Sequence, residues 1–321
     1  MNKRHGTSQD GIALLLVLWV LTILMVIVMS FSYMTRTETY ATLSFKEGIE
    51  NKFLAEAGIE RGIMELFYRN HYKDQTVEID NLGIWKTDGS PYEGQIDAGS
   101  YTVKIVDESG KVDINTTSDV VLKNLLMNMG IRMEDADTIT DSIMDWKDSD
   151  DLHRLHGAES DFYMSLPNPY KAKNARFDTI EELLLVKGMT PDILYGTPER
   201  TGIMLFLTVK AKSNTININA APKEVLAAIP GSSPEIADSI ISYRQNKEIQ
   251  NIQDVAGILG SNLNIMIPYL STEESGTFTI DAFGHKGAPQ RSYAIRATVV
   301  ISDTEETHRY LYYKSPANIQ P

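Results

Sequence analysis

The longest apolar run of the chain extends from Ile12 to Met29, with Thr22 as its only polar residue. At about 1.5 Å per helical residue, this run and its extension to Met34 can cross a bilayer core of about 30 Å. A buried helix of a soluble protein rarely goes so long without a charge. A cleaved secretory signal would have a shorter apolar run and a small-residue cleavage site. The pattern therefore predicts a transmembrane helix over residues 12–34.

The flanking charges and the next segment indicate how this helix continues. Lys3 and Arg4 precede the run, whereas the first basic residue after it is Arg36. The positive-inside rule therefore places the N-terminus in the cytoplasm and the body outside it. Residues 35–69 contain no proline, and apolar residues recur near helical spacing at Ile49, Phe53, Ala57, Met64 and Phe67. We expect an amphipathic extension over residues 35–69, in which three glycines lower the helix propensity.

Alternating apolar residues predict β-strands at both ends of the body. After Gly99 the alternation runs through Tyr101, Val103 and Ile105, breaks at Ser109–Gly110 and resumes at Val112 and Ile114, which predicts a hairpin. Turn formers between Asp74 and Gly99 predict a loop before it. Three more strands are predicted at Thr277–Gly284, Ser292–Ser302 and His308–Ser315. We therefore expect an α+β fold, in which one antiparallel sheet packs on the long N-terminal helix and is interrupted by an insertion.

Helical periodicity dominates the middle of the chain. Apolar stripes recur at Val121, Leu122, Leu125, Leu126 and Met129, at Ile139, Ile143 and Trp146, and at Ile180, Leu183, Leu184 and Val186. Plain core packing accounts for these stripes. Further on, a helix from Pro222, a turn at Pro230–Gly231 and a helix over Ile236–Arg244 resemble a helix-hairpin-helix (SAM-like) module, and Phe177–Thr190 resembles a diverged copy. We expect two helical modules, over residues 118–200 and 216–270.

Composition narrows the chemistry open to this architecture. The 321 residues carry 30 Lys and Arg against 43 Asp and Glu, a formal charge of -13, and no cysteine. The acidic balance disfavours a general nucleic-acid binder. In the helix-hairpin-helix segment, Arg244 and Lys247 lie among acidic residues, so we interpret it as a packing module. The lack of cysteine excludes disulfides, thiolate metal sites and cysteine nucleophiles.

The densest group of chemically active side chains is the sequence DWKDSDD, Asp145 to Asp151, followed by Glu159 and Asp161. Carboxylates this close repel one another unless solvent or a cation separates them, and closely spaced oxygen ligands suit calcium. The glycine and the last glutamate of an EF-hand loop are missing, so spacing alone leaves a solvated acidic turn and a calcium site equally open. His153 and His156 could chelate zinc here, but no HExxH motif of a zinc hydrolase is present.

The N-terminus resembles the class III signal of type IV pilins and type II secretion pseudopilins, in which a short basic leader ends in glycine before a long apolar helix. The match is Gly11 followed by Ile12-Ala13-Leu14-Leu15-Leu16. The resemblance implies cleavage by a prepilin peptidase between Gly11 and Ile12 and methylation of the new N-terminus. Most pilins have glutamate at the fifth mature position, where this chain has Leu16. That exception is typical of K-type minor pseudopilins, which cap the fibre tip.

The body extends this resemblance to K-type minor pseudopilins of type II secretion systems over nearly the whole chain. The matching motifs are DESGKVDIN, DWxDxDD, Gly157-Ala158-Glu159, Tyr163, Pro169-Tyr170 and Lys173-Asn174. In that family the helical insertion is associated with calcium, which implies the ligands Asp148, Asp150, Asp151 and Glu159, with Asp145 beside them. The resemblance also implies a pilin-like fold, no catalysis, and a single-pass inner-membrane protein with its body in the periplasm.

Partners and a role follow from the same resemblance. A K-type protein would form a tip complex with I-type and J-type minor pseudopilins, start pseudopilus assembly with other pseudopilins and the inner-membrane assembly platform, and support export of folded proteins across the outer membrane. Nucleic acid is not an expected partner. Two rival functions remain open: a membrane-anchored DNA-uptake protein or type IV pilus minor pilin, and a tethered metallohydrolase.

The expected organisation is a leader (1–11), a transmembrane helix (12–34), an amphipathic extension (35–69), a first sheet part (70–117), a helical insertion (118–270) and a last sheet part (271–321).

Overall fold

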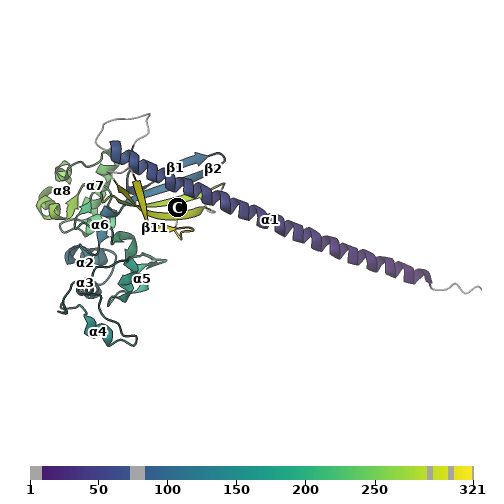
Figure 1. The fold of residues 1–321 in the computed structure, drawn as a ribbon, viewed down its shortest axis with the longest axis horizontal. Coiled ribbons are helices and arrows are strands. Elements are labelled where there is room, and N and C mark those ends of the chain that lie inside the picture. The colour runs from purple at the N-terminus through teal and green to yellow at the C-terminus, as the bar shows by residue number, and fades with distance from the viewer. Residues whose placement is uncertain (1–8, 73–83, 288–291, 303–306, 320–321) are drawn as a thin grey trace, which may run out of the picture.

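A single long helix dominates the outline of the molecule. The structure, a computed structural model, describes residues 9–72, 84–287, 292–302 and 307–319. Helix α1 (Gln9–Tyr72) is 64 residues long; its N-terminal half projects from the body and its C-terminal half lies on the sheet (Figure 1). The segments expected to be transmembrane and amphipathic thus form one continuous helix. Most of the expected leader lies outside the described residues.

Five strands form one antiparallel sheet in the order β1-β2-β9-β10-β11. They are β1 (Asp88–Ile96), β2 (Gly99–Asp107), β9 (Thr277–His285), β10 (Tyr293–Ser302) and β11 (Thr307–Lys314). Strand β2 pairs with β9, which follows the entire helical block in sequence, so the block is inserted between two neighbouring strands. Every second residue of β10 from Ile295 to Ile301 is buried against α1, as the period-two pattern predicts.

Two glycines let α1 approach the sheet closely. The buried α1 residues in this core are Ala55, Ile59, Ile63 and Leu66. A Cβ atom at Gly58 would lie 3.1 Å from the Ala282 Cβ, and one at Gly62 would lie 3.0 Å from the Ile280 Cγ2. Both distances are shorter than normal carbon contacts. The glycines weaken the helix locally, but they allow its backbone to pack flush on the strands.

The predicted hairpin around Ser109–Gly110 is wrong. Strand β2 is followed by a short 3-10 turn, η1 (Glu108–Gly110), and then by β3 (Val112–Asp113). Instead of returning along β2, β3 pairs in parallel with β6 (Leu207–Thr208), which lies in the helical block. A local turn signal is present, but the chain that leaves the turn belongs to the insertion.

Tertiary contact explains this outcome. A Cβ atom at Gly110 would lie 2.6 Å from the Ala220 carbonyl carbon, so the turn is pressed against the insertion. The strand that does form a hairpin with β2 is β1, which lies in the segment predicted as a loop. Pro91 and a register shift between Asp88 and Pro91 are tolerated in β1 because it is an edge strand.

The helical block folds around one hydrophobic core. Its first part contains α2 (Asp119–Asn128), α3 (Met133–Lys147), α4 (Ser160–Met164), the 3-10 helix η2 (Ile180–Leu185), α5 (Pro191–Leu194), β4 (Gly196–Thr197), β5 (Arg200–Thr201) and η3 (Ile203–Phe206). Its second part contains β7 (Ile216–Asn217), α6 (Lys223–Ala228), α7 (Pro234–Asn246), η4 (Ile252–Val255), α8 (Ala256–Leu259), η5 (Gly260–Asn262), α9 (Leu263–Met266), η6 (Ile267–Tyr269) and β8 (Leu270–Ser271). Side chains of both parts form one continuous buried cluster. The apolar stripe from Ile180 is a 3-10 helix instead of an α-helix.

A buried carboxylate joins the insertion to the sheet. Asp107, the last residue of β2, accepts hydrogen bonds from the Ser275 hydroxyl (2.6 Å) and from Asn217 Nδ2 (3.2 Å). Ser275 precedes β9, where the chain returns to the sheet, and Asn217 belongs to β7 of the insertion. One side chain therefore ties together the place where the chain leaves the sheet, the place where it returns, and the inserted domain.

A second polar contact fixes the end of α1 to the insertion. The Arg69 guanidinium is buried and pairs with Glu248, which follows α7, and with Glu274, which precedes β9 (2.5 Å to the latter). Removing one partner of a buried ion pair leaves an uncompensated charge, which is strongly destabilising. The helix, the sheet and the insertion are therefore connected on the same side of the body.

Candidate functional site

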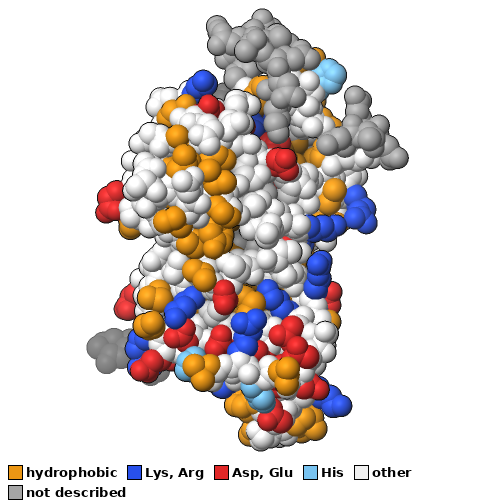
Figure 2. Space-filling view, turned by 90° about the vertical axis from the view of Figure 1, so that its left-hand side faces the viewer, with side chains coloured by type: hydrophobic (Ala, Val, Ile, Leu, Met, Phe, Trp, Pro, Cys, Tyr) orange, Lys and Arg blue, Asp and Glu red, His pale blue; other side chains and the backbone are white. Residues whose placement is uncertain are grey.

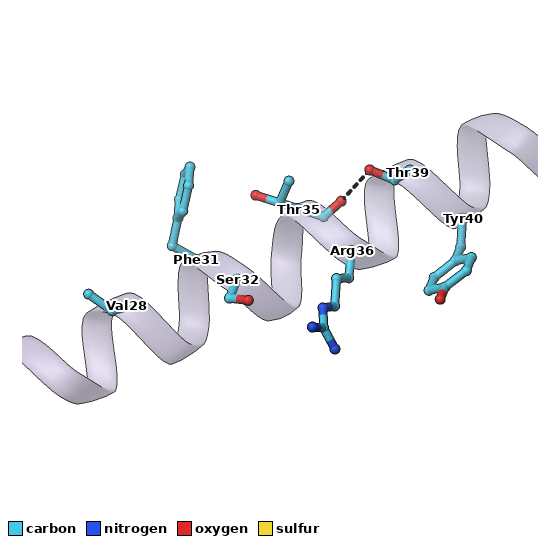
Figure 3. Close-up of a pocket in the computed structure, with 7 residues that line it drawn as sticks. All are labelled: Val28, Phe31, Ser32, Thr35, Arg36, Thr39 and Tyr40. Atoms are coloured by element: carbon cyan, nitrogen blue, oxygen red, sulfur yellow. Dashed lines mark hydrogen bonds between the residues drawn. The ribbon is translucent and has the colours of Figure 1, made fainter.

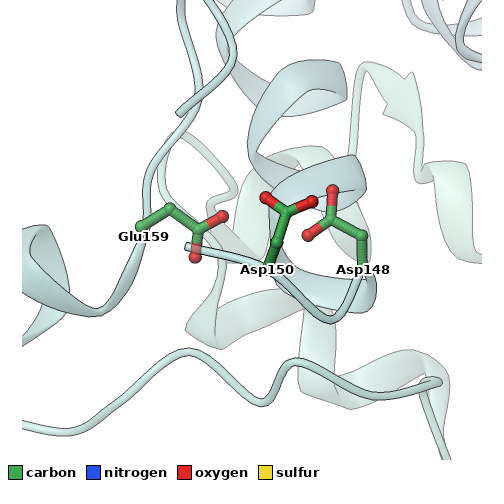
Figure 4. Close-up of side chains that lie close together, drawn as sticks. All are labelled: Asp148, Asp150 and Glu159. Carbon is green, nitrogen blue, oxygen red and sulfur yellow. The ribbon is translucent and has the colours of Figure 1, made fainter. Parts of the chain in front are cut away.

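Three carboxylates converge at the end of α3. Asp148 directly follows α3, and its backbone N–H donates to the Met144 carbonyl (3.1 Å). Asp150 lies in the same loop, and Glu159 is the N-cap residue of α4. One carboxylate oxygen from each of the three lies within 4.8 Å of the others. Figure 4 shows Glu159 directed from its own segment towards the two aspartates.

Burial makes this cluster electrostatically unfavourable on its own. Glu159 is 1% exposed, and neither of its carboxylate oxygens has a hydrogen-bond partner among the described residues; the same holds for Asp148 Oδ1. Burial, then the charges of Asp145 and Asp148, raises the pKa of Glu159 to about 7. Burial and the charge of Asp150 also raise the pKa of Asp148. Buried carboxylates without partners are destabilising unless a proton or a cation neutralises them.

Asp145 stabilises the loop between α3 and α4. It is fully buried, and its carboxylate accepts hydrogen bonds from the Arg154 backbone N–H (3.2 and 3.3 Å) while lying 3.6 Å from the Arg154 Nε. A Cβ atom at Gly157 would overlap this carboxylate, so glycine is required there. The contacts of Asp145 thus fix the chain between Asp150 and Glu159, and the residue lies outside the group of three.

Asn174 is a neighbour of the cluster that the sequence interpretation quoted but did not treat as a ligand. Its side-chain nitrogen donates to the Asp150 carbonyl and to Asp151 Oδ1, both at 3.2 Å, so Asp151 faces Asn174. The Asn174 side-chain oxygen is buried and has no hydrogen-bond partner in the described part of the chain. Its φ of 46° is in the left-handed region, which asparagine tolerates. The Lys173-Asn174 motif was the only signal for it in the sequence.

The donor set suits a hard cation. Asp148, Asp150 and Glu159 contribute carboxylate oxygens, and Asn174, whose side-chain nitrogen donates to the Asp150 carbonyl, has a buried side-chain oxygen with no partner among the described residues. Calcium takes six to eight oxygen ligands, whereas protein zinc sites are built from histidine, cysteine and fewer carboxylates. His153 is outside the group and pairs with the exposed Asp161 (3.0 Å). This set of side chains is therefore closer in chemistry to calcium sites than to zinc sites.

The helix-hairpin-helix segment uses its basic residue internally. Arg244 of α7 is buried, and its Nη1 donates to the Ile218 and Ala221 carbonyls (both 2.7 Å). At the hairpin, a Cβ on Gly231 would lie 3.1 Å from Ile265 of α9, which packs beside the turn. Figure 2 shows acidic and basic side chains mixed in the lower part of this face and a largely uncharged band above them. This face therefore presents no continuous basic surface to a phosphate backbone.

The N-terminal half of α1 is a second candidate functional surface. Residues 13–49 are exposed, including Leu16 at 61%. Within the described chain, α1 is the one helix long and apolar enough to cross a membrane. Arg36 follows the apolar stretch on the helix surface (Figure 3), and the Thr39 hydroxyl donates to the Thr35 carbonyl (2.8 Å). Because such hydroxyls are satisfied within the helix, lipid or other helices can cover this surface.

Comparison with known proteins gives a consistent result. The family model described as type II secretion system protein K matches residues 103–195, and a helix-hairpin-helix motif matches residues 211–263. The chain is 25% identical to type II secretion system protein K of Pseudomonas aeruginosa over 265 residues, 77% of this chain and 76% of that protein. It is 26% identical to the putative type II secretion system protein K of Escherichia coli K12 over 203 residues, 59% of this chain and 60% of that protein.

A solved structure has the same fold. It is the crystal structure of the GspK-GspI-GspJ complex of the enterotoxigenic Escherichia coli type 2 secretion system, in which the matching chain has a TM-score of 0.60 and 14% identity. The match covers 88% of this chain and 99% of that one. The solved structure agrees with the observed fold, and a helix-hairpin-helix motif matches the segment in which the structure has α6 and α7. The chain is therefore similar to type II secretion system protein K, the K-type minor pseudopilin, over most of its length.

Proposed function

We propose that this protein caps the tip of a type II secretion pseudopilus and starts its assembly with I-type and J-type minor pseudopilins. One observation carries the proposal: the insertion lies at the end of the body opposite the projecting N-terminal half of α1 (Figure 1). In a fibre, the apolar helices of the subunits would pack together on the membrane side. The insertion would then fill the space in which a further subunit would otherwise bind. The fibre can then grow only from below, and its growth supports export of folded proteins across the outer membrane.

The apolar helix gives the proposed localisation. Residues 12–34 would anchor the chain in the inner membrane, with the body in the periplasm, after a prepilin peptidase cuts between Gly11 and Ile12 and the new N-terminus is methylated. Leu16 fits a tip position, because a tip subunit meets no preceding N-terminus that would need a carboxylate. The inner-membrane assembly platform and the other pseudopilins would then add subunits beneath it. The role involves no catalysis.

Calcium belongs to the same proposal as a structural ion. Asp148, Asp150 and Glu159 would bind it through carboxylate oxygens. The Asn174 side-chain oxygen would be a further ligand, and Asp151 and Asp145 would stabilise the surrounding loop. The unpaired buried oxygens of Glu159, Asp148 and Asn174 support this assignment, since a cation would satisfy all of them. Bound calcium would stabilise the loop that links α3 to α4.

The proposed role can be tested on the full chain in membranes. Tagged protein, extracted in mild detergent, should co-purify with candidate I-type and J-type pseudopilins, and a large excess of it should shorten surface pseudopili because each copy caps one fibre. A variant that lacks residues 118–270 should still be membrane-bound but should no longer shorten them. Unchanged fibre length with excess intact protein, or failure to recover either partner, would contradict the tip assignment.

A further inference from the structure

A seam between α1 and β11 carries aromatic and acidic side chains outside the sites described above. We define the α1–β11 seam by Glu56 and Glu60 of α1 and by His308, Tyr310 and Tyr313 of β11. The Tyr310 hydroxyl donates to Glu60 Oε1 (3.3 Å), and the rings of Phe67 and His308 lie 6.2 Å apart, so strand and helix are in contact along this line. Strand β11 is an edge strand, and all of its eight residues are exposed.

The rings of the seam are arranged edge to face. Tyr310 and Tyr313 are 5.6 Å apart at 89°, and His308 and Tyr310 are 5.2 Å apart at 84°. Tyr310 and Tyr313 share a face because the register shifts by one residue at Leu311, where β11 bulges against β10. Tyr310 is 39% exposed and Tyr313 is 47% exposed. Rings that served only the core would be buried, whereas these two are partly exposed to solvent.

The charge of the seam is negative and unbalanced. Glu56 has Lys52 as a partner (3.5 Å), but no lysine or arginine pairs with Glu60 within the residues that the structure describes. Burial and the charge of Glu60 raise the pKa of Tyr310 to about 12, so its ring stays neutral at physiological pH. Neutral aromatic rings beside a carboxylate that has no cationic partner among the described residues attract an ammonium or guanidinium group.

The two edges of the sheet differ in how they are protected. Edge strand β1 contains Pro91, which opposes addition of another strand, whereas both edge strands have a register irregularity against their inner neighbour. Strand β11 contains no proline and exposes large side chains along its length, including Leu311 and Tyr312. Although β11 carries the exposed charges Arg309 and Lys314, an edge without proline can pair with an extended segment through main-chain hydrogen bonds.

The seam is also continuous with an exposed stripe along α1. Phe45, Ile49, Phe53, Glu56, Glu60 and Met64 follow one another at helical spacing and form one stripe, and its apolar members are exposed. A neighbouring subunit whose own N-terminal helix lies along the apolar part of this stripe has its body next to β11. The charge, the open edge and this continuity all point to the same occupant.

We infer that the α1–β11 seam is a docking site for a lysine- or arginine-bearing segment of a neighbouring pilin-like subunit, whose basic side chain lies over the rings of Tyr310 and Tyr313 and pairs with Glu60. This inference rests on the proposed function, because it names the contact through which the tip complex forms. The basic side chain is supplied by the partner, and the extended segment that carries it adds to the edge of β11.

The test is binding of detergent-solubilised full chain to candidate I-type and J-type pseudopilins, measured separately and together. Glu60→Lys and Tyr310→Ala should weaken binding of one partner roughly 5- to 30-fold, and Tyr310→Phe, which keeps the ring, should remain within about twofold of wild type. Glu224→Lys, an exposed charge reversal on α6, is the matched control and should bind like wild type. Melting temperatures of all variants verify that they fold.

The possible results distinguish a failure of this inference from a failure of the proposed function. If the wild-type chain binds neither partner, the proposed function fails. If the wild type binds while Glu60→Lys and Tyr310→Ala bind equally well, the tip role stands and the seam is not the docking site. If Glu60→Lys abolishes only self-association of this chain, the occupant is a second copy and the inference is overturned.

Discussion

Replacement of Glu159 by glutamine should stabilise the protein when calcium is absent and remove its response when calcium is present. Glu159 is buried, its carboxylate oxygens have no hydrogen-bond partner among the described residues, and its pKa rises from 4.5 to about 7. This difference corresponds to about 3 kcal/mol of unfavourable free energy for the ionised form, as an upper bound. Glutamine has nearly the same shape without the charge, so at pH 8 with chelator Glu159→Gln should unfold at a temperature several degrees higher than wild type.

The sign of the pH dependence follows from the same shift. The raised pKa of Glu159 gives a stabilising contribution that is complete below about pH 4.5, the ordinary value, and is lost as the pH rises through about 7. With chelator, the advantage of Glu159→Gln should therefore be large at pH 8 and small at pH 5. With calcium at 100 times its dissociation constant, wild type should gain about 2.7 kcal/mol, and the variant little.

The assay is thermal unfolding of detergent-solubilised full chain by circular dichroism, at pH 5 and pH 8, with chelator or with millimolar calcium. Glu224→Gln on the exposed face of α6 is the matched control and should change neither the melting temperature nor the calcium response. A variant at Glu159 that is less stable than wild type at pH 8 with chelator would refute the electrostatic reasoning. An undiminished calcium response in that variant would remove Glu159 from the ligand set.

Three further predictions concern processing, helix packing and the core. Gly11→Ala should block removal of the leader, read by mass spectrometry of the N-terminus; a mature chain that still starts at Ile12 would contradict it. Gly62→Ala should lower the melting temperature because its Cβ meets Ile280, whereas Gly48→Ala, with open space around it, should be neutral or stabilising by up to about 1 kcal/mol; equal effects of both would refute the close-packing argument. Leu125→Ala, at a fully buried position, should cost about 2–5 kcal/mol in denaturant unfolding, and a cost below about 1 kcal/mol would mean that the insertion core is loosely packed.

The parts of the fold that follow a simple period could be predicted from the sequence. The apolar run and its extension give α1, and alternation gives β10, because each element buries its own repeating face. Strand β1 could not be found in this way, since Pro91 and neighbouring turn formers are typical of a loop and only the edge position allows them in a strand. The position of the turn at Ser109–Gly110 was predicted correctly, but the strand that pairs with β2 was not. The turn packs against Ala220 of the insertion, and this tertiary contact cannot be read from the local sequence.

The candidate cation site, too, could be predicted from the sequence only in part. Asp148 and Asp150 are close in sequence, so their proximity in space follows from the local chain. Glu159 and Asn174 arrive from separate segments that only the packing of α3, α4 and the following loop brings together. Asp145 has the same residue type and lies in the same motif, yet its backbone contacts with Arg154 give it a different place. Residue type and spacing cannot show which of these carboxylates converge in space and which one contacts the backbone of the loop.

The paired contacts of Arg69 have a mechanical consequence. They join the end of α1 to both Glu248 in the insertion and Glu274 at the return to the sheet, while Gly62 keeps the helix flush on the strands. No flexible linker separates these contacts from the helix. A force applied along α1 would therefore pass through the Arg69 ion pairs both to the insertion and to the segment that returns to the sheet.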